Sequence, residues 1–206
     1  MIYVLAGTNG AGKSSIGGAM FRKAGAAYFN PDEAARQILA ANPRATQEQA
    51  NSQAWEQGAR MLQKAIDEDL VYAFETTLGG RTIAAMLGSA LSRGAEVRMW
   101  YVGLSRPELH LARVKARVAA GGHDIPEKKI RERFDTSRLN LIRLLPHLTE
   151  LRVYDNSKEA DPKKGRAPEP ALILRTARGR VVEHCDLAMA PEWTKPILVA
   201  ALNRRS

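Results

Sequence analysis

The chain has 206 residues, 45% of them hydrophobic and 26% charged, which suits one α/β domain with a sizeable core. Its only cysteine, Cys185, excludes an intrachain disulfide, and the first strand opens at Met1 without a basic, apolar leader, so we expect a cytoplasmic protein with no membrane partner. The net charge of +9 fits either nucleic acid or a ligand with several phosphates, and the position of the basic residues must decide between them.

The start of the chain carries its most specific motif. Ile2 to Ala6 is a short apolar run that predicts a buried strand, and residues 15–24 are expected to form a helix that ends at Gly25. Between them, residues 7–14 read Gly-Thr-Asn-Gly-Ala-Gly-Lys-Ser, which fits G-x-x-x-x-G-K-[ST] without a mismatch. Strand, glycine loop and helix in this order are the context of a phosphate-binding loop.

The residue types of this loop suit phosphate binding. Its glycines let backbone N–H groups approach a phosphate closely, and the N-terminus of the following helix adds further N–H donors. Lys13 is expected to reach the β- and γ-phosphates, and the Ser14 hydroxyl to bind Mg²⁺. The predicted nucleotide site therefore comprises Gly7, Thr8, Asn9, Gly10, Ala11, Gly12, Lys13, Ser14 and Ser15.

A second strand, Ala26 to Phe29, leads into a helix that ends near Ala41. Asn30 is a suitable N-cap for this helix, and Pro31 suits its first position. Asp32 has two interpretations. It is either an acid that complements the helix dipole or a carboxylate at the carboxyl end of a strand, where open α/β sheets bind ligands. Spacing alone favours neither.

Residues 47–70 have the pattern of a long helix. Trp55, Leu62 and Ile66 repeat at helical spacing, so we assign this stripe to core packing and give Trp55 no role in ligand binding. The strand that follows, residues 71–74, ends in Glu75-Thr76-Thr77. A carboxylate and two hydroxyls that leave a buried strand beside a phosphate loop form a candidate binding site.

The basic residues gather in the middle of the chain. After a helix over 81–93 and a strand over 97–104, Ser105-x-x-Glu108 predicts a capped helix that ends at Gly121-Gly122. Asp124 and Glu127 stand at the same spacing and predict the cap of a second helix. Residues 105–145 contain ten Lys and Arg against five Asp and Glu. They are either two ordinary solvated helices or a mobile lid that places arginines over a triphosphate. We rank His123 below the arginines, as a possible turn residue.

The last third of the chain predicts a strand over 151–154, an exposed loop over 158–170, a β-hairpin over 172–184 and a terminal helix from Pro191. No internal repeat is visible.

Taken in order, these motifs resemble the zeta toxin family of P-loop kinases. The resemblance rests on the phosphate loop, Asn-Pro-Asp, Phe-Glu-Thr-Thr-Leu, Arg-x-x-x-Arg with Gly-Gly-His-x-Ile-Pro, and Tyr-Asp-Asn-Ser, and it covers residues 1–157. It implies an α/β, three-layer P-loop kinase-like fold with a central parallel sheet flanked by helices. One domain, residues 1–206, would hold a helical lid over about 106–145 and an extension over about 158–206 with a β-hairpin and a helix.

The resemblance also implies an activity and its residues. A kinase of this family uses ATP and Mg²⁺ to phosphorylate the 3′-hydroxyl of UDP-N-acetylglucosamine and acts as the toxin of a toxin–antitoxin pair, which implies an antitoxin partner. By position, Asp32 matches the general base, and Glu75 and Thr77 match the substrate-binding acid and hydroxyl, beside Asn30. Lys13 and the lid arginines Arg117 and Arg133 would act in catalysis, with Arg113 and Arg131 close enough to be confused with them. Asn156 lies on the expected adenine side.

Two departures and two alternatives stay open at this point. The phosphate loop starts almost at Met1, so we expect no antitoxin-docking segment ahead of it, and the hairpin and final helix lie outside the resemblance. The protein could phosphorylate another small hydroxylated acceptor, such as a nucleoside or an antibiotic. It could also be a nucleic-acid-binding NTPase or polynucleotide kinase, although the sequence has no basic stripe interleaved with aromatics, so we expect no specific nucleic-acid partner.

Overall fold

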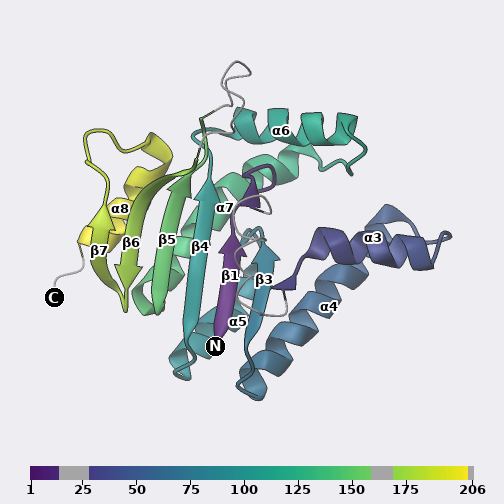
Figure 1. Ribbon diagram of the computed structural model, residues 1–206, viewed down its shortest axis with the longest axis horizontal. Helices are drawn as coiled ribbons and strands as arrows, with labels where there is room; N and C mark the ends of the chain where they lie inside the picture. Colours follow the sequence, from purple (N-terminus) through teal and green to yellow (C-terminus); the bar gives the residue numbers. More distant parts are fainter. Residues whose placement is uncertain (14–27, 159–168, 204–206) are drawn as a thin grey trace.

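The computed structural model describes residues 1–13, 28–158 and 169–203, whose strands form one seven-stranded sheet in the order β2-β3-β1-β4-β5-β6-β7 (Figure 1). The first five in this order run parallel, and β6 and β7 run antiparallel to their neighbours. The strands are β1 (Ile2–Ala6), β2 (Tyr28–Phe29), β3 (Tyr72–Thr76), β4 (Val97–Gly103), β5 (Glu150–Asp155), β6 (Ala171–Ala177) and β7 (Arg180–His184).

Helices flank this sheet, and in Figure 1 α5, α7 and α8 lie behind it while α6 crosses above the carboxyl ends of the parallel strands. The helices are α3 (Pro31–Ala41), α4 (Gln47–Asp67), α5 (Arg81–Ser92), α6 (Pro107–Ala119), α7 (Glu127–Leu144), α8 (Lys195–Leu202) and the short 3₁₀ helices η1 (Leu145–His147) and η3 (Glu192–Thr194). None of the helices in the described ranges has the length and apolarity needed to cross a membrane. The predicted α/β sheet flanked by helices is confirmed, and it is mixed because the C-terminal hairpin joins its edge.

The main core lies between the sheet and the helices behind it. Alternate residues of β1, Ile2 and Val4, face this core together with Leu87 of α5 and Leu141 of α7. Leu5, the residue after Val4, faces a smaller cluster on the other side of the sheet, and Tyr3, which lies between Ile2 and Val4, packs against that cluster. Successive side chains of a strand point to opposite faces, so this alternation shows that β1 is covered on both sides, as its uninterrupted apolar sequence predicts.

The predicted caps of two helices are wrong, although both helices form. The helix α6 begins after Arg106 and has no side-chain cap, because the Ser105 N–H donates to the Ser157 hydroxyl at 2.7 Å and so joins the loop after β4 to the loop after β5. Asp124 likewise accepts the N–H of Ile125 and does not cap α7. Both corrections have the same cause, since tertiary contacts and local turns compete with a capping box for the same groups.

The core stripe predicted for the helix α4 is only partly right, since Leu62 is buried and Ile66 packs against the main core, whereas Trp55 is exposed. The buried residues of this helix are mostly small and follow a different face: Ala50, Ala54, Gly58, Leu62 and Ala65. They lie against α3, whose buried residues, Ala34 and Ala35, are small as well. Because the small residues let the two helices approach closely, Trp55 falls on another face and is 47% exposed. The helix also ends at Asp67 and not at residue 70, since Asp69 has a φ of 50°, which a helix does not allow.

Candidate active site

The phosphate loop leaves the carboxyl end of β1 and passes close to two other backbone segments. Gly7 has a φ of 142°, and a Cβ on it would lie 2.0 Å from the carbonyl oxygen of Val102 in β4. Gly10 has a φ of 79°, and its Cβ would lie 2.7 Å from the carbonyl oxygen of His110 in α6. Only glycine fits either position. Ser14, Ser15 and the helix predicted over 15–24 lie outside the described residues.

His110 connects the loop to the lid helix α6. Its side chain is buried, its Nδ1 lies 2.8 Å from the carbonyl oxygen of Asn9, and its ring meets Phe134 edge-on. Burial lowers the pKa of His110 to about 4, with smaller lowering effects from Lys13 and Arg113, while the hydrogen bond to Asn9 opposes them. The ring is therefore neutral at pH 7, with the Nδ1 proton donated to the loop backbone.

We expect His110 to make the folded state sensitive to acid. Its folded pKa, about 4, is below the ordinary value of 6.5, so between these pH values the unfolded state binds a proton that the folded state does not. The contribution of His110 to stability is complete above pH 6.5 and is lost as the pH falls towards 4, by about 3 kcal/mol in the free energy of unfolding. Urea unfolding at several pH values measures this loss.

The controls are His110→Gln, which keeps a donor for the Asn9 carbonyl but does not titrate, and His184→Gln at an exposed position of β7. The first should flatten the pH dependence between 6.5 and 4, and the second should leave it as in the wild type. Equal slopes for wild type and His110→Gln would show that His110 is already protonated in the folded protein.

Lys13 and Glu75 form a buried pair at the base of the site. Lys13 Nζ lies 3.4 Å from Glu75 Oε1 and donates to the Thr8 carbonyl at 3.4 Å. Glu75 Oε2 accepts a 2.8 Å hydrogen bond from the Tyr28 hydroxyl and a 3.1 Å bond from the Asn30 amide. Among the described residues, the donors that hold the Glu75 carboxylate include Tyr28, Asn30 and the lysine of the phosphate loop.

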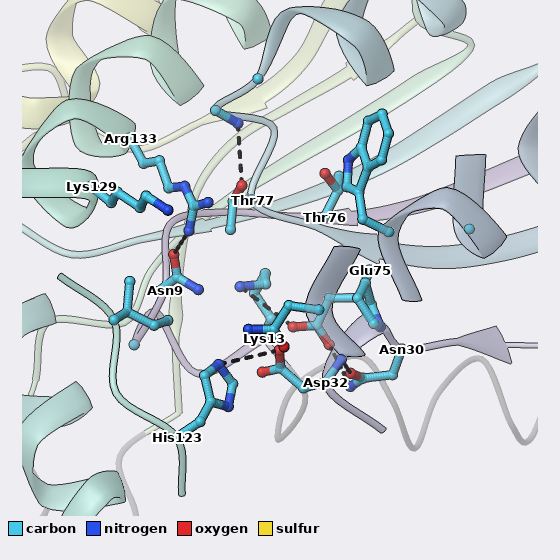
Figure 2. Close-up of a pocket in the computed structure, with 18 of the residues that line it drawn as sticks. Asn9, Lys13, Asn30, Asp32, Glu75, Thr76, Thr77, His123, Lys129 and Arg133 are labelled. Atoms are coloured by element: carbon cyan, nitrogen blue, oxygen red, sulfur yellow. Dashed lines mark hydrogen bonds and ion pairs between the residues drawn. The ribbon is translucent and has the colours of Figure 1, made fainter. Parts of the chain in front are cut away.

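Asp32 stands in the first turn of α3, does not cap that helix, and faces the lid. The cap of α3 is Asn30, whose Oδ1 accepts the N–H groups of Asp32 at 2.8 Å and Glu33 at 3.2 Å, as the sequence predicts. The Asp32 carboxylate lies 3.8 Å from Nε2 of His123 (Figure 2). It also lies 3.5 Å from Nη1 of Arg117. It therefore lies between the first turn of α3 and two basic side chains of the lid.

Of the four lid arginines singled out from the sequence, Arg113, Arg117 and Arg133 line the cleft and Arg131 does not. Arg133 Nη1 donates to Asn9 Oδ1 at 2.8 Å, and Arg113 Nη2 donates to the Asn156 carbonyl at 2.8 Å. Burial lowers the pKa of Arg133 below its ordinary value, against the opposite effects of the Glu132 and Asp32 carboxylates. Arg131, by contrast, is held outside the cleft by Glu127 at 2.7 Å and Glu108 at 2.8 Å. The structure thus separates two arginines that the sequence left ambiguous.

Two further predicted residues also contact these segments. The Asn156 amide, after β5, donates to the Ala11 carbonyl of the phosphate loop at 2.8 Å. Thr77, after β3, accepts the Gly79 N–H on its hydroxyl at 3.4 Å and the Ser137 hydroxyl of α7 on its carbonyl at 2.7 Å. The ends of β1, β2, β3 and β5 thereby bring their polar residues to one edge of the sheet.

A cavity of about 1770 Å³ joins these groups. We call the cavity-lining residues within 29–32, 48–59 and 74–83 the α4 side, and those within 9–13, 113–133 and 156–158 the lid side. Among the described residues, the α4 side has three acids and no Lys or Arg, whereas the lid side has six cations: Lys13, Arg113, Arg117, Lys129, Arg133 and Lys158.

The sequence reasoning missed several lining residues. Asn51, Ser52 and Trp55 of α4 line the cavity, and so does Lys129 of α7. The spacing of residues 48, 51, 52, 55 and 59 places them on one face of α4. This helical spacing could have indicated a ligand-facing surface, but the prediction that Trp55 packs in the core assigned the face to the wrong environment. Lys129 carries no local signal, because it is one of many basic residues on its helix.

The sequence of this chain is similar to a known protein family and to a bacterial protein. The family described as Zeta toxin matches residues 1–161. A Haemophilus influenzae protein of uncharacterized function is 34% identical over 128 residues, which are 62% of this chain and 88% of that protein.

Solved structures show the same fold at low identity. A crystal structure of AvrRxo1-ORF1:-ORF2 with ATP is similar with a TM-score of 0.67 at 16% identity, over 100% of this chain and 64% of that chain. The PezAT chromosomal toxin–antitoxin system of Streptococcus pneumoniae gives a TM-score of 0.55 at 15% identity, over 79% of this chain and 70% of that one. The chain therefore spans just under two thirds of the length of the AvrRxo1 chain.

Proposed function

The chain belongs to the zeta toxin family, and from that premise we propose that it is a kinase that transfers the γ-phosphate of ATP to a hydroxyl of a small molecule. The observation that carries the proposal is the shared cavity of Lys13 and Asp32. A phosphate-binding lysine and a carboxylate able to take a proton open into one space, in which the six lining cations lie on the lid side together with Asp124 and Glu132, and the described part of the α4 side carries acids alone. Phosphoryl transfer needs this combination, because alignment and charge neutralisation supply most of its rate.

In the proposed mechanism each described side chain has a defined task. Asp32 takes the proton of the attacking hydroxyl as general base. Lys13, Arg117 and Arg133 neutralise the charge that develops on the transferred phosphoryl group. The acceptor itself would be held by three groups at the ends of β2 and β3, which are the side chains of Asn30, Glu75 and Thr77.

The nucleotide and its metal belong to the same proposal. Asn156, which contacts the loop, and Arg113, which donates to the Asn156 carbonyl, would lie on the adenine side of ATP. Mg²⁺ binds largely through phosphates and water, so a single protein hydroxyl, Ser14 directly after Lys13, would suffice. When bound, Mg²⁺ would offset phosphate charge. The cavity fits such a group, since Lys13 opens into it beside the carboxylates of Asp32 and Glu75.

The family suggests the acceptor, a nucleotide sugar such as UDP-N-acetylglucosamine phosphorylated on its 3′-hydroxyl. The PezAT system, similar in fold, is described as a toxin–antitoxin system. We therefore include an antitoxin among the proposed partners.

One observation favours a second acceptor class. In the described part of the α4 side, the charged residues are Asp32, Glu48 and Glu75, and none is cationic. These carboxylates do not stabilise the negative charges of a diphosphate. An uncharged nucleoside or a cationic antibiotic carries no negative charge for them to repel. The basic residues of 105–145, four of which line the lid side, support the lid interpretation over a nucleic-acid surface.

Mass spectrometry tests the proposed reaction. The protein is incubated with ATP and Mg²⁺ and a panel of nucleotide sugars, nucleosides and aminoglycosides, and each acceptor is examined for the added mass of one phosphate. We expect one class to be phosphorylated, and UDP-N-acetylglucosamine against uridine separates the two candidates. ATP hydrolysis with no phosphorylated acceptor in the panel would contradict the small-molecule kinase.

The lid arginines give a matched pair of variants. Arg133→Ala should lower turnover by about a hundred-fold, because its guanidinium is directed into the cleft beside Asn9. Arg131→Ala, two residues away on the same helix, should leave turnover within about two-fold, since Arg131 is an exposed partner of Glu127 and Glu108 and surface pairs contribute little. Steady-state rates of phosphorylated product measure both variants. Equal losses of turnover in the two variants would mean that α7 acts through its total positive charge and not through the position of Arg133.

A further inference from the structure

The helix α4 presents a large aromatic ring to the cavity. Trp55 is 47% exposed and lines the cavity together with Ser52, one turn before it, and Ala59, one turn after it. In the described part of the chain its indole takes part in no ring–ring or cation–π contact. A tryptophan that packing does not require, and that faces a cavity, is costly to expose unless a ligand covers it.

The surroundings of Trp55 suit a flat, polar ring. Ala59 is small and leaves the space beside the indole open, while Asn51 and Ser52 add an amide and a hydroxyl on the same face of the helix. Across the α4 side, Thr82 and Ile83 of α5 line the same space. Such a site, apolar on its walls with a few hydrogen-bonding groups, is typical for a heteroaromatic ligand.

The position of the indole depends on the close packing of α3, α4 and β2. A Cβ at Gly58 would lie 2.6 Å from the ring of Phe29, so glycine lets the strand residue pack directly against the helix. The face of α4 that carries Ala50 and Ala54 is buried in the same contact. The rotation of α4 is thereby fixed, and Trp55 is held towards the cavity on a rigid helix.

From these observations we infer that Trp55 is a stacking platform for a nucleobase or a similar heteroaromatic ring of the phosphate acceptor. The ring lies on the indole, Asn51 and Ser52 bind its polar edge, and the hydroxyl to be phosphorylated extends towards Asp32 and Glu75, which stand on the same side of the cavity (Figure 2). The inference rests on the proposed function, because it takes the α4 side as the acceptor side. It adds the residue that selects the acceptor, since Trp55 favours a molecule with both a hydroxyl and a planar ring over a plain sugar.

Tryptophan fluorescence tests this subsite without any turnover. The other two tryptophans, Trp100 and Trp193, are 7% and 3% exposed, so an added ring can cover only Trp55. With a non-hydrolysable ATP analogue present to fill the lid side, the protein is titrated with the four ribonucleosides and UDP-N-acetylglucosamine. The ring-free probes are N-acetylglucosamine and glucose. We expect saturable quenching by at least one ring-bearing probe and none by the ring-free probes.

Three variants complete the experiment. Trp55→Ala should weaken binding of the ring-bearing probe, measured by calorimetry, about five- to hundred-fold, the usual effect of removing an aromatic stacking partner. Trp55→Phe should recover most of the affinity and lose the fluorescence signal. Met61→Ala, which removes a half-exposed apolar residue of the same helix outside the cavity, should bind as the wild type does. All three should bind the ATP analogue normally.

The outcomes separate this inference from the proposed function. Wild-type affinity in Trp55→Ala, or no quenching by any ring-bearing probe, overturns the stacking platform even if the protein proves to be a kinase. Quenching that depends on Trp55, together with no phosphorylation of any acceptor, upholds the subsite and contradicts the kinase.

Discussion

Replacement of Lys13 by alanine is expected to lower phosphoryl transfer by at least about a hundred-fold, because it removes the cation of the phosphate loop from the cavity. The structure adds an expected loss of stability. Lys13 and Glu75 are a buried pair, and removal of one partner from such a pair often costs about 3–5 kcal/mol. The hydrogen bonds from Tyr28 and Asn30 to the Glu75 carboxylate should reduce that cost.

A second substitution separates these two effects. Lys13→Arg keeps a positive charge beside Glu75, so its melting temperature should be closer to that of the wild type. Its turnover should stay low, because the wider, planar guanidinium does not reproduce the point charge of the lysine ammonium. Lys64→Ala, at an exposed position of α4, serves as the control for loss of a lysine. Melting temperature, ATP binding and product formation are measured on each preparation. An active Lys13→Ala protein would rule out the phosphate-loop interpretation.

The parts of the fold that follow from the sequence are those with local signals. The glycine loop after β1 and the Asn30 cap of α3 depend on residues next to each other in the chain, and the structure has them where they were predicted. The family and the P-loop kinase-like fold are likewise confirmed. The prediction of an ATP-dependent phosphotransferase agrees with the family match.

The parts that the sequence did not predict depend on contacts between distant segments. Ser105 does not cap α6, because its N–H donates to the hydroxyl of Ser157, which is 52 residues away. The face on which Trp55 lies was decided by the packing of α3 on α4, which a periodicity in one helix does not reveal. Both errors have one cause. A local sequence pattern indicates whether a segment is a helix or a strand, but the face that is buried and the residues at which the element ends depend on tertiary contacts.

The candidate site shows the same division. The strand order brings Asp32 and Glu75 to one edge, which parallel β-topology predicts. The proximity of His123 to Asp32, and the difference between Arg131 and Arg133, depend on how the lid lies over the sheet. No spacing along the chain contains that information, because these contacts join segments that are far apart in the sequence, such as Arg133 and Asn9, which are separated by 124 residues.

Asp32→Asn is expected to lower turnover by about a hundred-fold or more while the protein keeps its fold and its ATP binding. Asparagine has the size of aspartate and hydrogen-bonds in a similar way, but it cannot take a proton from the acceptor hydroxyl. An acid that only complements a helix dipole contributes about 0.3–1 kcal/mol to stability and nothing to rate. The geometry makes the catalytic role the stronger expectation, because the Asp32 carboxylate is directed at Arg117 and His123 and does no capping.

Glu33→Gln is the matched control for this variant. Glu33 lies in the same turn of α3, close to the same helix N-terminus, but it does not line the cavity. Its loss should cost a similar amount of stability and leave turnover within about two-fold, so a catalytic role separates the two variants by rate and not by melting temperature. Thermal melting, ATP binding and the mass-based product assay on both proteins decide the question. If Asp32→Asn and Glu33→Gln matched in all three measurements, Asp32 would be a dipole partner, and another group would have to take the proton.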